Sequence, residues 1–276
     1  MTGLYLLTIK ELLSKKIILT VFILGTLFCI ALIFALNLEY GGMDSKVMIS
    51  IFGNAVESSG NAQNFSAGKI LGYIQSGIAV TIFFISLFIS LFSVSSVFPD
   101  MLKKGNIDLL LSKPASRSKI FFQRFSGAMT AVSFNVFYII LFSWVILSVK
   151  FDIWNFRLII SGFVIMIFFF NIFALMAMTA MFIKNSVISL MMTYFLVFIL
   201  SPIVAGVERF GGSKDSFLSM LSGLLHGILP KVSETVLYIN NLITGGELTN
   251  SVLWSSVLSG LIFSGFSLFV FKKTDF

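Results

Sequence analysis

The chain has 276 residues, of which 57% are hydrophobic and only 11% charged, and its formal net charge is +7. Soluble globular domains carry about 25% charged residues, so the composition excludes an ordinary soluble domain. It indicates an all-α integral membrane protein, with residues 1–276 forming a single transmembrane domain. The only cysteine, Cys29, excludes a disulfide or a cysteine-based metal site within the chain.

Residues 1–16 are expected to form a short amphipathic helix on the membrane surface. The apolar positions with helical spacing are Tyr5, Ile9, Leu12 and Leu13. The polar positions on the other face are Lys10, Glu11, Ser14 and Lys15. Glu11 and Lys15 have the spacing of a favourable helical ion pair. The alternative is an ordinary charged flank of the first membrane span.

Six uncharged segments are long enough to cross a bilayer, since about 20 apolar residues span its hydrocarbon core. They are residues 17–36, about 73–98, 125–149, 158–183, 186–207 and 252–271. The first follows three lysines, as in a signal peptide, but it is longer than a signal h-region of about 7–15 residues and is expected to be retained as a span. Helices are expected because backbone polar groups must be paired internally in lipid.

The distribution of charge predicts the orientation of these spans. With six spans, both termini lie on one side, which collects twelve of the 19 lysines and arginines and four of the 12 acids. Cytoplasmic loops are enriched in Lys and Arg. The N- and C-termini and the connection 99–124 are therefore expected in the cytoplasm. This topology accounts for the basic excess, so no nucleic-acid partner is predicted.

Two connections are expected on the outer side. Residues 37–69 are rich in Gly, Ser and Asn and are expected to be largely irregular. Residues 208–251 contain an uncharged run, Phe217 to Leu229, that is too short to cross the bilayer. A second helical pattern begins near Pro230 and ends at Gly245. Short re-entrant or interfacial helices are therefore expected between spans five and six.

The chemistry that the chain lacks narrows its function. No span contains Asp, Glu, Lys, Arg or His, which argues against a proton relay. His226, the only histidine, lacks the partners of a zinc site. Gly68-Lys69 is not a phosphate-binding loop, because Gln63 and Ile70 stand where Gly and Ser or Thr are needed. The chain is not expected to be an enzyme or to carry a cofactor or metal of its own.

Neutral polar and small residues inside the spans leave alternatives open. The candidate pathway-lining or interhelical hydrogen-bonding positions are Asn135, Asn171 and Tyr194. A row of small residues on the last span consists of Ser256, Gly260 and Ser264. Such a row permits close helix contact, either within the chain or in a dimer.

Residues 99–124 contain the most polar stretch for a long way in either direction. Pro99 interrupts the end of span two, and Gly105-Asn106 forms a break. A short apolar face is then formed by Ile107, Leu110 and Leu111. Pro114 ends this short helix, and Ser116 can cap the next one. The pattern predicts a stiff cytoplasmic elbow of helix, break and helix.

This elbow resembles the connection between spans two and three of ABC-2 type permeases, the membrane subunits of a class of ABC transporters. The matching residues, in order, are Gly105, Ile107, Asp108, Leu109, Leu110, Leu111, Ser112, Pro114, Ser116 and Arg117. Asn106 departs from the usual Thr, and the usual upstream glutamate is replaced by Asp100 or by no residue. The amphipathic N-terminal helix, six spans and short outer helices agree with the same class.

The resemblance implies a membrane subunit of an ATP-driven exporter in the cytoplasmic (inner) membrane. Two such permeases, identical or related, would pair in the lipid, and each would dock a separate ATPase subunit that binds ATP. The residues implied in ATPase coupling are Gly105, Ile107, Asp108, Leu110, Leu111, Pro114 and Arg117. The resemblance does not specify the exported substrate.

Other classes of function remain as alternatives. A membrane anchor that recruits a cytoplasmic partner without transport could use the same elbow. A gradient-driven carrier is disfavoured by the charge-free spans. An intramembrane enzyme is disfavoured because the sequence holds no catalytic constellation.

Overall fold

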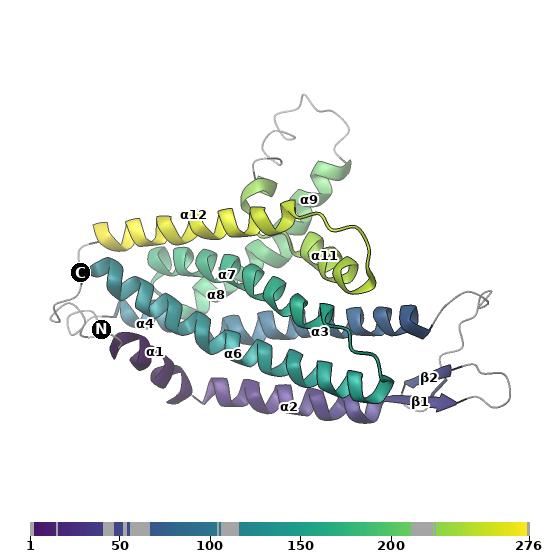
Figure 1. Ribbon diagram of the computed structural model, residues 1–276. Helices are drawn as coiled ribbons and strands as arrows, with labels where there is room; N and C mark the ends of the chain where they lie inside the picture. The colour runs from purple at the N-terminus through teal and green to yellow at the C-terminus, as the bar shows by residue number, and fades with distance from the viewer. Residues whose placement is uncertain are drawn as a thin grey trace.

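The structure, a computed structural model, describes residues 3–14, 16–40, 47–51, 54–55, 67–103, 105, 116–210, 223 and 225–274. Over these residues the chain forms an elongated helix bundle with a small sheet at one end (Figure 1). Five helical stretches are long and apolar enough to cross a membrane. The prediction of a helical, multi-pass membrane protein is therefore confirmed, but the small sheet was not predicted.

Two helices begin the chain, α1 (Gly3–Ser14) and α2 (Ile17–Ala35). They meet at a bend of 64°, where Lys16 has a left-handed φ of +57°. The bend separates the helix that carries Lys10 and Glu11 from the uncharged one. The two together count as a sixth candidate span only if the bent pair is taken as one.

The sheet follows α2 directly and consists of β1 (Leu36–Tyr40), β2 (Val47–Ile51) and β3 (Asn54–Ala55). It is antiparallel, with β1 and β2 paired from Leu36 and Ile51 to Tyr40 and Val47. Part of the 37–69 connection, expected to be largely irregular, therefore forms strands, and the rest of it lies mostly outside the described residues. The residues of β2 include the β-branched types that favour strands, between the Gly- and Ser-rich stretches that dominate the composition.

The next span combines α3 (Ala67–Val94) and α4 (Val97–Met101), which together cross as Gly72–Met101. The break between them lies at residues 95–96, upstream of the predicted interruption at Pro99. A proline ring clashes with the carbonyl four residues earlier and cannot donate to it. The helix is therefore interrupted one turn before Pro99, which itself lies inside α4.

Helix α6 (Arg117–Phe151) has 35 residues and begins eight residues before the predicted start of its span. At a rise of about 1.5 Å per residue it is about 52 Å long, well beyond the hydrocarbon thickness of about 30 Å. Hydropathy marks only the apolar part of a helix, but the helix predicted to follow Ser116 includes Arg117 and Arg124. Helix α6 does begin directly after Ser116, although the Ser116 side chain makes no capping hydrogen bond.

Helix α7 (Arg157–Ile183) is followed after a two-residue turn by α8 (Ser186–Tyr194). Asn185 caps α8, because its side chain accepts hydrogen bonds from the backbone N–H groups of Val187 and Ile188. A π-helical stretch η2 (Phe195–Leu200) and α9 (Ser201–Phe210) continue α8 as the candidate span Ser186–Val207.

The last described elements are α11 (Val232–Thr244) and α12 (Ser251–Lys273). Helix α11 lies where the sequence predicts a short helix ending at Gly245, and it packs against α3 and α7. Its residue Ile239 is fully buried. It is thus part of the bundle.

Helix α7 is the most deeply buried of the candidate spans, with 72% of its apolar window inside the molecule against at most 56% for the others. Phenylalanine rings join it to α4 and α6. Phe98 lies 5.1 Å from Phe121, and Phe125 lies 4.7 Å from Phe173, between ring centroids. These rings fix the relative positions of three helices near the end of the bundle where α1 begins.

The bundle has two ends, which differ in what they contain (Figure 1). The α1 end holds α1, the start of α6 and the last turn of α12. The opposite end, the sheet end, holds the strands and the connection from α6 to α7. The two names are used in this sense below.

Candidate functional site

The predicted coupling elbow lies partly within the described residues. Gly105 has a φ of +88°, so the expected break occurs there in a conformation that glycine adopts readily. The predicted coupling residues that lie outside the described residues are Ile107, Asp108, Leu110, Leu111 and Pro114. Both flanks of the elbow are described, and they lie at the α1 end.

Arg117, the first residue of α6, joins that helix to the end of α12. Its Nη1 donates to the carbonyl oxygens of Lys272 and Thr274, at 2.9 and 2.8 Å. The last carbonyls of a helix have no partner within it, and a guanidinium satisfies them while favouring the negative end of the helix dipole. Arg117 therefore has a defined place inside the chain.

Arg124, two turns further along α6, joins that helix to α1. Its guanidinium forms an ion pair with the carboxylate of Glu11. The side chain of Arg124 is only 8% exposed and that of Glu11 is 29% exposed. From the sequence, Arg124 was expected in the helix after Ser116 and among the cytoplasmic-side charges, but its pairing with Glu11 was not predicted. The signal that could have found the pair is the position of Glu11 as the one acid of the N-terminal segment.

Helix α1 packs on α6 through a narrow stripe. Leu4, Thr8 and Leu12 are buried, and Gly127 of α6 allows the close approach. A Cβ atom at residue 127 would lie 3.0 Å from the Thr8 Cβ and 3.2 Å from the Tyr5 carbonyl oxygen. The buried face of α1 is therefore rotated about the helix axis relative to the predicted apolar face. The close contact with α6 requires a small residue at position 8.

The outer face of α1 leaves leucines exposed. They are Leu6, Leu7 and Leu13, each more than 40% exposed. Leu13 was expected on the apolar face with Leu12, which lies on the opposite, buried side. Glu11 pairs with Arg124, whereas its predicted partner Lys15 lies outside the described residues.

An exposed ion pair precedes the elbow. The Lys103 ammonium lies 2.7 Å from the Asp100 carboxylate. The hydrogen bond to Asp100, aided by its negative charge, raises the pKa of Lys103 above its ordinary value. Lys103 therefore keeps its positive charge at neutral pH.

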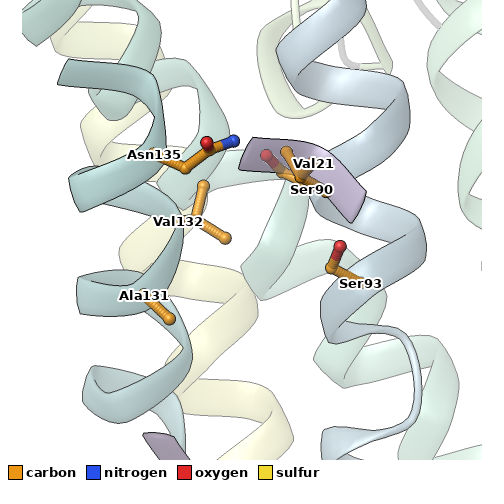
Figure 2. Close-up of a pocket in the computed structure, with 6 residues that line it drawn as sticks. All are labelled: Val21, Ser90, Ser93, Ala131, Val132 and Asn135. Atoms are coloured by element: carbon orange, nitrogen blue, oxygen red, sulfur yellow. The ribbon is translucent and has the colours of Figure 1, made fainter. Parts of the chain in front are cut away.

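Asn135 lies near the middle of α6, beside a small hollow that α2, α3 and α6 enclose. The lining residues are Val21, Ser90, Ser93, Ala131, Val132 and Asn135. In Figure 2 the amide of Asn135 and the hydroxyl of Ser90 point toward one another across it. Asn135 is 3% exposed, and neither its nitrogen nor its oxygen makes a hydrogen bond within the described part of the chain.

The other two candidate pathway residues have different surroundings. Tyr194 of α8 donates from its hydroxyl to the backbone carbonyl of Phe88 in α3 at 2.6 Å, so it makes an interhelical hydrogen bond. Asn171 of α7 is fully buried, and its two amide atoms have no partner among the described residues. Of the three positions, only Asn135 lines the hollow.

The row of small residues on α12 faces α7 of the same chain for part of its length. Ser256 is 4% exposed. A Cβ atom added to Gly260 would lie 2.6 Å from a ring carbon of Phe170 and 3.1 Å from the Cα of Asn171. Ser264 is only partly buried. Contact with α7 therefore accounts for Ser256 and Gly260 without a second subunit, and the dimer role remains a prediction.

His226 has an acidic partner that the sequence analysis did not identify. Its Nε2 lies 2.8 Å from a carboxylate oxygen of Glu234, and Lys231 lies 3.5 Å from the other oxygen. Among the described residues, no three His, Cys, Asp or Glu side chains gather in a group that could hold a metal ion. The three residues form a local polar cluster at the start of α11.

Comparison with known proteins assigns no family. No protein-family model matches the chain, and no curated protein matches its sequence significantly.

Proposed function

We propose that this chain is the permease subunit of an ATP-driven exporter of the ABC-2 type. In this proposal α2 is the first of six spans, the α1 end and both termini face the cytoplasm, and the chain lies in the cytoplasmic (inner) membrane. The observation that carries the proposal is the pair of arginine contacts made by the helix that ends the elbow. Arg117 binds the end of α12, and Arg124 binds Glu11 of α1.

These contacts suit a coupling role for mechanical reasons. Helix α6 starts within the elbow, at Arg117, and runs without a break through 35 residues. A partner that pushed on the elbow would move the start of α6, and the two arginines would move α1 and the end of α12 with it. Such rigid-body motion of packed helices is a known way of converting a local event into a larger rearrangement.

The proposed roles of the elbow residues follow the resemblance. Gly105 supplies the break, and the ATPase is contacted by Ile107, Asp108, Leu110, Leu111 and Pro114. Arg117 is proposed to position α12 against α6, because its guanidinium already binds backbone carbonyls of α12. The ATPase is a separate subunit that binds ATP, and a second permease, identical or related, completes the pathway.

The proposal is tested by co-purification of the protein with a separately encoded ATPase. In the recovered complex, Leu110→Asp is expected to reduce both the bound ATPase and the stimulation of its activity, because it puts a charge into an apolar contact. Leu109→Asp is the matched control, since it lies in the same segment but off the predicted face. A complex that tolerates Leu110→Asp as well as Leu109→Asp would remove the coupling role.

The anchor alternative predicts the same complex without transport. Sealed vesicles that contain the complex distinguish the two functions, because an exporter moves its substrate only when ATP is supplied. A complex that hydrolyses ATP normally and recruits its partner, yet moves no candidate amphiphile, would favour the anchor.

A further inference from the structure

The hollow between α2, α3 and α6 is lined by both apolar and polar side chains. Val21, Ala131 and Val132 supply the apolar wall, and Ser90, Ser93 and Asn135 supply the polar groups. The space is about the size of one water molecule. A single small group could therefore enter it.

The polar wall has unused hydrogen-bonding capacity. The side-chain amide of Asn135 offers donors and an acceptor, and none of them has a partner in the described part of the chain. Ser93 donates to the carbonyl of Ile89 at 2.9 Å, which leaves its oxygen able to accept. Buried polar groups are nearly always hydrogen-bonded, so a group inside the hollow is expected to complete this set.

We propose that the hollow binds one uncharged hydroxyl group, hydrogen-bonded by Asn135. The hydroxyl belongs either to a water molecule or to the headgroup of an alcohol-bearing amphiphile whose tail lies outside the hollow. The inference does not depend on transport, since a membrane anchor with the same three helices would have the same site.

The lining excludes other ligand classes. It contains no charged side chain, so an ion entering it would lose water without gaining a counter-charge. A hard cation such as calcium takes about six or more oxygen ligands, whereas this wall offers three polar side chains. A carbonyl group only accepts, and it would leave the oxygen of Asn135 unpaired. A hydroxyl both donates and accepts, so it matches both ends of the amide.

The amphiphile source is tested by photolabelling the full chain in phosphatidylcholine nanodiscs. The probe is octanol that carries a diazirine, and the matched probe is the diazirine-bearing octane that lacks the hydroxyl. The alcohol probe is expected to label the segments around Ser90 and Asn135 about five times more than the alkane probe does. This is the ratio of binding that one net hydrogen bond gives. Asn135→Leu is expected to remove this excess, and Asn171→Leu, at a buried asparagine outside the hollow, is expected to keep it.

The water source is tested by NMR of the same nanodiscs with deuterated lipid. The side-chain amide protons of Asn135, identified by their loss in Asn135→Leu, are expected to show a cross-peak to water if water fills the hollow. Asn135→Ala replaces the leucine variant if that one does not fold. An Asn135-dependent alcohol excess or this cross-peak supports the site. The proposal is overturned if the cross-peak is missing and labelling depends on neither the hydroxyl nor Asn135.

Discussion

The α1 end and the middle of the bundle differ in the charge and the hydrogen-bond partners of their polar side chains. At the α1 end, Arg117 binds two carbonyls of α12, and Arg124 pairs with Glu11. In the middle, the polar side chains are neutral, and two of them, Asn135 and Asn171, have no partner among the described residues. Partnered charges and unpartnered amides therefore occupy separate regions of one bundle.

The cost of removing each group from water explains this difference. An unpaired charge in a low-dielectric region is far more costly than an unpaired amide, so a charge persists there only with a defined partner. The partners then hold helix ends in fixed positions. A neutral amide can stay buried without a partner, and it remains able to hydrogen-bond a polar group that enters. The α1 end is thus suited to transmitting force, and the middle is suited to recognising an uncharged group.

The largest effect is expected from Arg124→Ala. It removes the guanidinium that pairs with Glu11, and with it the tie between α1 and α6. Breaking a buried ion pair costs about 3–5 kcal/mol, and the lower end of that range applies because Glu11 is partly exposed. The measurement is the midpoint of thermal unfolding in detergent, which is expected to fall clearly.

Two controls separate the ion pair from a general loss of positive charge. Lys119→Ala removes a partly buried cation five residues earlier on α6 and is expected to change the midpoint little. The double exchange Glu11→Arg with Arg124→Glu restores opposite charges and is expected to recover part of the loss. Equal effects of Lys119→Ala and Arg124→Ala would show that the pair has no special role.

Gly260→Ala tests whether the middle of the bundle is held by packing within one chain. The new Cβ would lie 2.6 Å from the Phe170 ring and 3.1 Å from the Asn171 backbone, so α12 must shift away from α7. Overpacking of this kind costs about 1–3 kcal/mol. The thermal midpoint is expected to fall, whereas Gly265→Ala, which meets nothing within 4 Å, is expected to hold or raise it, because Ala favours a helix interior over Gly.

Gly260→Ala and its control Gly265→Ala also test the predicted dimer contact. Size-exclusion chromatography with light scattering reports whether the protein remains associated. If Gly260 packs only on α7, stability falls in the monomer and the dimer alike. A change in association without a change in thermal stability would instead assign Gly260 to the subunit interface.

A smaller effect is expected from Tyr194→Phe. The substitution keeps the ring against Phe88 but removes the hydrogen bond to the Phe88 carbonyl, which measures 2.6 Å. A net hydrogen bond contributes about 1 kcal/mol. Tyr73→Phe, at a tyrosine that is 57% exposed, is the control and is expected to change the thermal midpoint less. Equal shifts in the two variants would mean that the Tyr194 bond adds nothing to stability.

Most of the helical architecture was predictable because each span is a long uncharged run. The predicted 158–183 and 186–207 agree closely with α7 and with the stretch Ser186–Val207. The basic start of α6 was predictable from Ser116 as the residue before a helix, although hydropathy alone begins the span only at residue 125. The sheet was missed because its short strands lie among Gly- and Ser-rich residues.

The candidate sites were less predictable because they depend on contacts between distant residues. Glu11 and Arg124 are separated by more than a hundred residues, and no local pattern joins them. Asn135 was identified as a neutral polar residue inside a span, but its facing Ser90 comes from another helix. Sequence periodicity reports which residues share a helix face, whereas the partner of that face is set by the packing of the whole bundle.

The smallest effect is expected from Asn171→Leu, which replaces an unpartnered amide by an apolar group of similar shape. Removing a buried polar group that has no partner can be neutral or stabilising, so the change in unfolding free energy is expected to stay within about 1 kcal/mol. The measurement is the same thermal midpoint, read beside that of Arg124→Ala. A loss as large as that of Arg124→Ala would mean that Asn171 has a partner in the membrane, such as a bound water. In that case the contrast between charges with partners and amides without partners would not apply to Asn171 of α7.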